Sequence, residues 1–426
     1  KSEYAMMELE LLSVLAESTG KAYPTEELNR MWEMILTNQF HDILPGSSIH
    51  EVYEQTKKEY AEIAETSAKL IGERMEALCG TKDESVTVWN TLGHRRNDVV
   101  VLGETAAETT VYPVQQTKDG AIVYAENLPS KGYQVLRPTS GAAAETPFAV
   151  TEAGEGYTLE TPFYTIQIDA NGEFTSLFDK ENDREVLQSG TTGNELRIYE
   201  DKPLQYSAWN LDIFHTEKSW KVEGVRRMEW TENGPVRATL EIEREVMDTV
   251  IRQQIHFYAK DRRIDFETYV DWKFAEHVLK VHFPVDVHSD EATFDIQFGN
   301  VTRKLHTNTS WDQARFEVCG HKWADISEGS YGVSLMNDCK YGYDIHDSVI
   351  RLTLIKCGNY PNPDADKCRH KFTYSLFPHS GDFREAGTVK LAYLLNSPLE
   401  AKKIESQNGT LPEEYSLLSI DSENVI

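Results

Sequence analysis

The feature that most constrains this chain is a change in hydrophobic periodicity near residue 85. Before this point, apolar residues recur every three or four positions, which is typical of helices that bury one face. From about Val86 onward, apolar and polar residues alternate with a period of two, clearly so at 238–243 and 263–270. The pattern therefore predicts an α+β chain with several domains, in which a helical region comes before a β region.

The helical region predicts three helices. The first stops before Pro24, and the second starts with Thr25 as its N-cap. The third follows a capping box formed by Ser48 and Glu51. Because the loops between these helices are short, we expect an antiparallel three-helix bundle over residues 1–82.

The β region predicts mainly antiparallel sheets, because its strands do not alternate with long helices. Turn signals at 171–172 and 233–234 separate many of the strands. A segment with linker composition, 138–147, divides a small β domain at 85–137 from a large one at 148–387. The large domain has too many strands for one open sheet, so we expect a β-sandwich. Further strand candidates lie at 164–168, 251–258, 331–336, 350–355 and 371–376.

The last residues contain two more strand candidates, at 388–396 and 415–420. Two strands cannot bury a core by themselves. We therefore expect residues 388–426 to join the small β domain. The chain opens with Lys1 inside a helical pattern and ends in what resembles an unfinished strand, so we expect a piece of a longer protein.

The net charge indicates which kinds of partner are excluded, and the cysteines indicate the cellular compartment. A formal net charge of -27 repels phosphate backbones and anionic lipids, which argues against nucleic acid and membrane partners. No apolar run is long enough to span a bilayer. The five cysteines are odd in number and contain no CxxC pair, which favours reduced thiols and a cytoplasmic location over a disulfide framework or a thiolate metal cluster.

The segment 38–48, Asn-Gln-Phe-His-Asp-Ile-Leu-Pro-Gly-Ser-Ser, carries the strongest chemical signal. The adjacent His41 and Asp42 stand at a helix end, next to a Pro-Gly break that can leave both side chains at the mouth of a cleft. Imidazole binds zinc, and a carboxylate can accept hydrogen bonds from sugar hydroxyls. A His-Asp pair at a helix end also serves as a cap or a dipole partner, so the residues alone leave both interpretations open.

Two other pairs of histidine and aspartate have simpler interpretations. His288 and Asp290 lie deep in the β region, where we expect a loop between strands. His346 and Asp347 are expected in a hairpin turn.

Residues 39–48 resemble the bacterial and cytosolic members of glycoside hydrolase family 38, the class II α-mannosidases. Other stretches are similar to the family's β region in order and spacing, namely 207–212, 331–338, 340–344 and 369–379. The resemblance implies a middle helical domain followed by a large supersandwich of the galactose-mutarotase type. It also implies that His41 is a zinc ligand and that Asp42 binds hydroxyls of the bound mannose.

The resemblance places the nucleophile, the acid/base carboxylate and the other zinc ligands in an N-terminal barrel, which we expect to be missing here. No catalytic residue is therefore expected in this chain. The family's β region lends residues to the rim of the active site, which makes Lys340 and Tyr341 candidates for substrate binding. Other large aromatics could stack on sugar rings, but such residues more often fill cores; these are Trp209, Trp311, Trp323 and Tyr343.

The function implied is the middle and C-terminal part of a zinc-dependent retaining α-mannosidase that hydrolyses non-reducing terminal α-mannosides or oligosaccharides. The piece alone is expected to be inactive and without bound zinc. One alternative is a non-catalytic carbohydrate-binding or scaffold protein built on the β-sandwich. Another is a hydrolase or lyase of a different family with a similar accessory fold.

Overall fold

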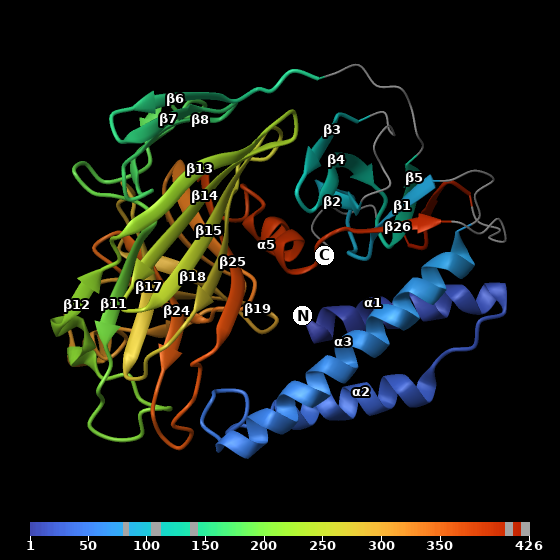
Figure 1. Ribbon diagram of the computed structural model, residues 1–426, viewed down its shortest axis with the longest axis horizontal. Coiled ribbons are helices and arrows are strands. Elements are labelled where there is room, and N and C mark those ends of the chain that lie inside the picture. Colours follow the sequence, from blue (N-terminus) through green and yellow to red (C-terminus); the bar gives the residue numbers. More distant parts are fainter. Residues whose placement is uncertain (80–84, 104–111, 137–143, 405–411, 419–426) are drawn as a thin grey trace. The chain divides into compact units, whose positions relative to one another are not determined.

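The computed structural model describes residues 1–79, 85–103, 112–136, 144–404 and 412–418 (Figure 1). The chain divides into two compact units. The first unit contains residues 1–145 together with 396–426, and the second contains residues 146–395. Most of the expected linker, 138–143, lies outside the described residues, as do the end of the expected helical domain at 80–82 and residues 419–426.

The first unit begins with the three expected helices, α1 (Ser2–Ala16), α2 (Thr25–Asn38) and α3 (His50–Leu78), with a short 3-10 helix, η1 (Glu17–Thr19), after α1. Each long helix turns an apolar stripe toward one shared core. Leu9 of α1, Met31 and Ile35 of α2, and Ile63 and Ile71 of α3 are all buried there. The expected helical region is thus confirmed.

Both predicted helix caps are wrong. Pro24 occupies the N-cap position of α2, and no side chain caps that helix. Helix α3 begins one residue later than the capping box requires, with Ile49 rather than Ser48 at its N-cap. The backbone N–H of Ser48 donates instead to the hydroxyl of Tyr53 at 2.9 Å. A side chain further along the chain has therefore replaced the local cap.

Two small sheets complete the first unit. The four-stranded sheet has the order β26-β1-β5-β27, and the three-stranded sheet has the order β2-β4-β3. Val88 of β1 packs against the three-stranded sheet, whereas Trp89 joins the core of the helices. Strand β1 is therefore buried on both faces. The strands are β1 (Ser85–Asn90), β2 (Arg96–Gly103), β3 (Val114–Thr117), β4 (Gly120–Leu128), β5 (Gly132–Leu136), β26 (Glu400–Ile404) and β27 (Glu414–Ser416).

The second unit consists of three sheets. Their orders are β10-β9-β8-β7-β6, β12-β11-β17-β24-β23-β20 and β13-β14-β15-β16-β25-β22-β21-β18-β19. The first sheet contains β6 (Ala149–Ala153), β7 (Gly156–Glu160), β8 (Tyr164–Ile168), β9 (Phe174–Asp179) and β10 (Arg184–Glu185). The second contains β11 (Glu195–Glu200), β12 (Ser219–Lys221), β17 (His277–Pro284), β20 (Val318–Cys319), β23 (Gly342–His346) and β24 (Val349–Cys357). The third contains β13 (Val225–Asn233), β14 (Arg237–Val246), β15 (Thr249–Tyr258), β16 (Ile264–Asp271), β18 (Glu291–Ile296), β19 (Gly299–Lys304), β21 (Trp323–Glu328), β22 (Tyr331–Asn337) and β25 (Arg369–Ser380).

One core joins the six-stranded and nine-stranded sheets into the expected sandwich. Ile198 of β11 and Val281 of β17 meet Leu240 of β14 and Phe266 of β16 in this core, and all four are buried. Each strand contributes alternate residues to it, as the period-two pattern predicts. Neighbouring strands pair antiparallel, for example β14 with β15 and β17 with β24. The α+β class with antiparallel sheets is confirmed.

Short helices cover parts of the second unit. These are η2 (Ile213–Glu217), α4 (Ser310–Gln313) and α5 (Thr388–Asn396). The expected strand at 388–396 is wrong, because this segment is helix α5. Thr388 and Ala392 are buried four residues apart, and Ala392 packs against Trp323 and Phe377. Packing on the nine-stranded sheet, together with the helix tendency of the Leu side chains, has overridden the strand tendency of the Thr, Val and Tyr side chains.

The strands after α5 pair within the first unit. β26 lies antiparallel to β1, and β27 lies antiparallel to β5. Strands β26 and β27 therefore extend the sheet that contains β1 and β5, whereas α5 up to residue 395 belongs to the second unit. Of the second expected strand, 415–420, residues 419–420 lie outside the described residues.

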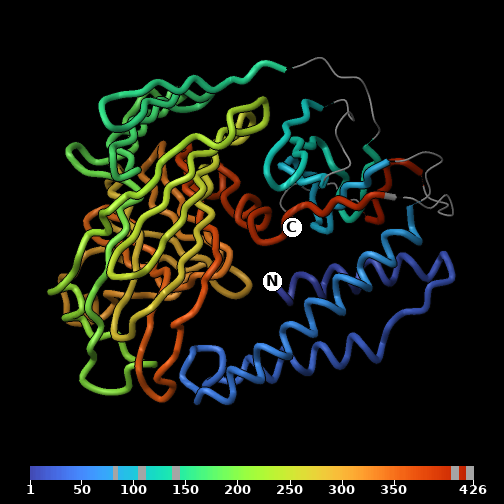
Figure 2. Tube along the Cα trace, in the orientation of Figure 1, coloured from blue at the N-terminus to red at the C-terminus, as the bar shows by residue number. Residues whose placement is uncertain are grey.

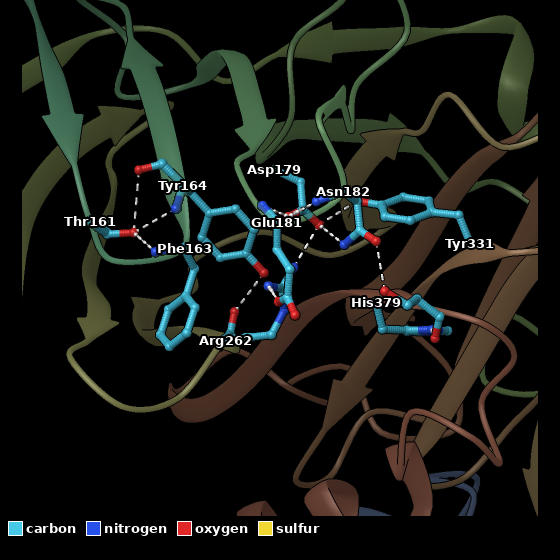
Figure 3. Close-up of polar contacts among 10 residues, drawn as sticks. Thr161, Phe163, Tyr164, Asp179, Glu181, Asn182, Arg262, Tyr331 and His379 are labelled. Carbon is cyan, nitrogen blue, oxygen red and sulfur yellow. Dashed lines mark hydrogen bonds and ion pairs between the residues drawn. The ribbon is translucent and has the colours of Figure 1, made fainter.

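A buried carboxylate ties the five-stranded sheet to the nine-stranded sheet (Figure 3). Asp179 at the end of β9 is fully buried and pairs with Arg262 between β15 and β16 at 2.6 Å. It also accepts hydrogen bonds from the hydroxyl of Tyr331 in β22 at 3.0 Å and from Asn182 at 2.9 Å. Burial favours the neutral acid, but Arg262 and Asn182 outweigh it and hold the pKa of Asp179 below its ordinary value.

We expect Asp179→Asn to lower the free energy of unfolding of the second unit by about 3 kcal/mol at pH 7, because it leaves a mostly buried guanidinium without its main partner. Urea denaturation of wild type and variant measures the difference. The carboxylate stabilises the fold above the ordinary carboxyl pKa of about 4 and ceases to do so as the pH falls through its lower folded value, so the difference should shrink in acid.

Glu181→Gln is the matched control, because Glu181 pairs with the same Arg262 but is 69% exposed. An exposed ion pair contributes less than about 1 kcal/mol. Equal losses in the two variants would contradict the importance given to the buried pair.

Candidate functional site

The segment that carries His41 and Asp42 is a compact loop between α2 and α3, at one end of the helical part (Figure 2). Its backbone makes successive turns, with the N–H of Ile43 and of Leu44 both donating to the carbonyl of Phe40. Gly46 has a φ of +80°, a left-handed conformation that suits glycine at the end of a helical segment. The Pro-Gly break thus ends the turns and redirects the chain into α3.

His41 and Asp42 lie together and face solvent within the first unit. The His41 side chain is 78% exposed and that of Asp42 is 33% exposed, with 3.4 Å between His41 Nε2 and Asp42 Oδ2. The ring of Phe40 lies 4.2 Å from the imidazole. An exposed imidazole beside a half-buried carboxylate can bind a metal ion or hydroxyl groups.

Side chains on the loop and on α3 fix the position of Asp42. The hydroxyl of Ser47 lies 3.4 Å from Asp42 Oδ1 and 3.3 Å from the Asp42 carbonyl. The hydroxyl of Tyr53 lies 3.3 Å from both the Asp42 and the Ile43 carbonyls and accepts the N–H of Ser48. The loop is therefore held from the first turns of α3.

A second contact connects the end of α2 to α3. The side chain of Asn38 is buried; its carbonyl accepts the Thr56 hydroxyl at 2.7 Å, and its amide donates to Glu59 at 2.6 Å. The same amide donates to the Met34 carbonyl at 2.9 Å. These bonds fix the point at which α2 ends, and with it the start of the loop.

Lys340 and Tyr341 lie in the second unit, in the turn between β22 and β23. The side-chain oxygen of Asn337 accepts the backbone N–H of Lys340 at 2.6 Å, which fixes this turn. The Lys340 ammonium lies 4.5 Å from the centre of the Phe372 ring. Tyr341 is 52% exposed, and its ring lies 5.4 Å from that of His321. The two candidates are therefore neighbours on an ordered turn.

The other candidate aromatics divide into two groups. Trp323 and Tyr343 are buried and fill cores, as the simpler interpretation expects. Trp209 and Trp311 are exposed, at 60% and 80%. The expected loop around 288–290 lies between β17 and β18, and the turn at 347 lies between β23 and β24. Asp347 there has a φ of 53°, as a tight hairpin turn requires.

Within the described residues, the side chains of His, Cys, Asp and Glu gather nowhere in a group of three that could hold a metal ion. In the same part of the chain, no helix is both long and apolar enough to cross a membrane.

Two family models match this chain. The model described as the alpha mannosidase middle domain matches residues 1–78, the helical part. The model described as the glycosyl hydrolases family 38 C-terminal domain matches residues 159–364, within the second unit. Together they match more than half of the chain, in the order that the sequence predicts.

Curated relatives match the chain along nearly all of its length. Alpha-mannosidase 2C1 of Homo sapiens is 33% identical over 434 residues and covers 100% of this chain. Alpha-mannosidase G of Dictyostelium discoideum is 32% identical and covers 91%. The chain spans only 40% of the length of each of these relatives.

Solved structures share the fold. An alpha-mannosidase from Enterococcus faecalis V583 superposes with a TM-score of 0.79 at 16% identity, covering 97% of this chain and 57% of that chain. A second Enterococcus faecalis protein, of glycosyl hydrolase family 38, superposes with a TM-score of 0.75 at 15% identity and covers 97% of this chain and 61% of its own. The arrangement of helices and sheets, the two domain models and the relatives agree, and the chain belongs to glycosyl hydrolase family 38, of which it comprises the middle and C-terminal domains.

Proposed function

We propose that this chain is part of a zinc-dependent retaining α-mannosidase that removes non-reducing terminal α-mannosyl residues from α-mannosides or oligosaccharides. The observation that carries this proposal is the loop at 39–48. It belongs to a family 38 middle domain and presents His41 and Asp42 together on a fixed backbone. Relatives named alpha-mannosidase support the same assignment.

The residues of the loop fit a partial zinc site. His41 offers an exposed imidazole, and Asp42 offers a carboxylate oxygen 3.4 Å from it. A catalytic zinc site has about three protein ligands, so His41 would be one, and the others would come from residues outside this chain. Zinc, when bound, supplies a positive charge that coordinates sugar hydroxyls.

The residues of this chain would bind and orient the sugar. Asp42 would accept hydrogen bonds from mannose hydroxyls, with its backbone held by Tyr53. We also propose Lys340 and Tyr341, on their ordered turn, as substrate-binding residues. The nucleophile and the acid/base of a retaining glycosidase are two carboxylates, and we assign them to a barrel domain elsewhere in the longer protein.

The surface around the loop supports a contact with such a barrel domain. Phe40 and Leu44 flank His41 and Asp42 in the sequence and are 52% and 68% exposed. Apolar side chains exposed beside polar site residues are typical of a surface that another domain covers. We further propose a cytoplasmic location, since Cys79 and Cys357 are buried thiols that form no disulfide.

This assignment predicts that the 426-residue chain alone does not hydrolyse an aryl α-mannoside, even with added zinc, because both catalytic carboxylates lie elsewhere. A colorimetric assay of the purified chain measures this. The longer protein, assayed in parallel, is the positive control. Turnover that co-purifies with the chain alone would contradict the placement of the catalytic groups.

In the longer protein, His41→Ala should abolish activity and lower the zinc content, because it removes one of about three ligands. The helical fold should persist, since the His41 side chain is 78% exposed and contributes little packing. Activity, metal analysis and circular dichroism measure the three effects. His50→Ala is the matched control, an exposed histidine at the start of α3 that should leave rate and zinc unchanged. Wild-type rate and zinc content in His41→Ala would remove the main support for the proposal.

Tyr53→Phe should loosen the loop although Tyr53 itself lies on α3, because the substitution removes the hydroxyl that accepts the Ser48 N–H. A lost hydrogen bond of about 1 kcal/mol corresponds to about fivefold faster exchange of the Ser48 amide. Hydrogen exchange measures this directly. Tyr60→Phe, two turns further along α3, is the control. Equal protection of Ser48 in both variants would show that the hydroxyl does not hold the loop.

A further inference from the structure

The six-stranded sheet of the second unit carries a row of polar side chains on the face turned away from the sandwich core. Leu196, Val281, Leu352 and Ile345 of this sheet are buried in the core, so their neighbours in sequence face the other way. Strand register aligns these neighbours in one row, in the order Glu195, His282, Arg351 and Asp344.

A cavity of about 400 Å³ lies over this row, and we name it the outer-face cavity. Its volume falls within the range of about 300–1,000 Å³ that small-molecule sites occupy. Besides the row, strand residues Arg197, Tyr199, Ser219 and His346 line it, and three residues outside the strands complete it: His215 and Thr216 of η2, and Phe316.

The charges of the cavity are already neutralised by one another. Arg197 Nε lies 2.8 Å from Glu195 Oε1, and Arg351 Nη1 lies 3.1 Å from Asp344 Oδ1. The buried Lys280 pairs with Glu317 at 2.5 Å. Each cation therefore has its own carboxylate, and the carboxylates of Glu195 and Asp344 line the cavity. Such a lining repels an anion and leaves a neutral ligand as the better fit.

The histidines add hydrogen-bonding groups without adding charge. Burial, together with the nearby Lys280, lowers the pKa of His215; burial, together with Arg351, Arg197 and Lys280, lowers that of His282. Both rings are therefore neutral at pH 7. His282 Nε2 lies 2.9 Å from the hydroxyl of Tyr199, which satisfies it.

His215 has one nitrogen without a partner. Its Nδ1 lies 2.9 Å from the carbonyl of Asp212, so Nδ1 carries the proton and donates it there. Its Nε2 is then an acceptor, and it has no hydrogen-bond partner among the described residues although His215 is only 3% exposed. An unused buried acceptor is costly unless a ligand or water donates to it. The group that suits it is a hydroxyl.

We propose that the outer-face cavity binds a neutral polyhydroxylated ligand, a sugar unit, through the second unit alone. Sugar hydroxyls would donate to His215 Nε2 and to the carboxylates of Glu195 and Asp344, and would accept from the guanidinium groups of Arg197 and Arg351. Tyr199 and Phe316 supply apolar ring surface for the sugar's C–H groups. The proposal does not rest on the mannosidase assignment, because it uses no residue of the loop at 39–48.

The test is saturation-transfer NMR and calorimetry on the 426-residue chain, with neutral methyl glycosides of mannose, glucose, galactose and N-acetylglucosamine as probes and with inorganic phosphate as the anionic comparison. We expect at least one glycoside to bind and phosphate not to compete with it. Absence of binding by every glycoside, or displacement of the glycoside by phosphate, would overturn the proposal.

Matched variants locate the binding. His215→Asn keeps an amide that can donate to the Asp212 carbonyl but removes the acceptor at Nε2, and should weaken glycoside binding about tenfold. His215→Gln, which places an amide near Nε2, should bind more tightly than His215→Asn. Glu195→Gln keeps the shape of a side chain at the cavity wall and should also weaken binding about tenfold.

His288→Gln is the control, because His288 is 88% exposed in the same unit and does not line the cavity. Its affinity for the glycoside should equal that of wild type. Thermal unfolding of each variant establishes that it is folded. Wild-type affinity in both His215→Asn and Glu195→Gln would place the bound sugar elsewhere and overturn the assignment. These measurements need no mannosidase activity, so failure of one proposal is distinguishable from failure of the other.

Discussion

The second unit depends on the rule that a β-strand sends successive side chains to opposite faces. Because the six-stranded and nine-stranded sheets share one core, every strand has to give alternate positions to apolar side chains such as Ile198 and Val281. The positions between them do not face the core and can carry polar side chains. On the six-stranded sheet they carry Glu195, Arg197 and His282, and the outer-face cavity follows from the same alternation that builds the core. The same alternation of side chains therefore forms both the core of the fold and the candidate binding site.

Sheets that share a core still need to be fixed relative to one another, and polar contacts do this where apolar packing is not directional. Asp179 brings together Arg262 and Tyr331, from distant parts of the chain, on one buried carboxylate. A charge in this position is costly unless all its partners are present, so the arrangement favours one placement of the five-stranded sheet. In the first unit, Asn38 plays a comparable part by linking α2 to Thr56 and Glu59 of α3.

The sequence predicted the elements well where periodicity was long, and poorly where tertiary contacts decided. The three helices and the strands around 238–243 and 331–336 follow from their apolar spacing. Helix α5 did not, because nine residues rich in Val, Tyr and Leu suit either state and packing against Trp323 decides between them. The capping box at Ser48 failed for a related reason, since Tyr53 supplies the contact that a local cap would have made.

The loop at 39–48 could be found in the sequence as a motif, whereas the outer-face cavity could not. Its polar residues stand at alternate positions of 195–199 and 280–282, but only the register shows that they form one row.

Different contacts hold the side chains of the loop and of the outer-face cavity, and this difference affects the kind of ligand that each can bind. In the loop, the backbone is held by Tyr53 and Ser47, while the imidazole of His41 stays exposed and makes few contacts. Such a group is free to take a strong, directional partner such as a metal ion supplied together with other ligands. In the cavity, Arg197 and Arg351 are already paired with carboxylates before any ligand enters. A ligand there gains little from charge and has to match many moderate hydrogen bonds at once. Selectivity among ligands of the cavity then comes from the positions of their hydroxyl groups. A buried polar group without a hydrogen-bond partner weakens binding by more free energy than one satisfied hydrogen bond contributes.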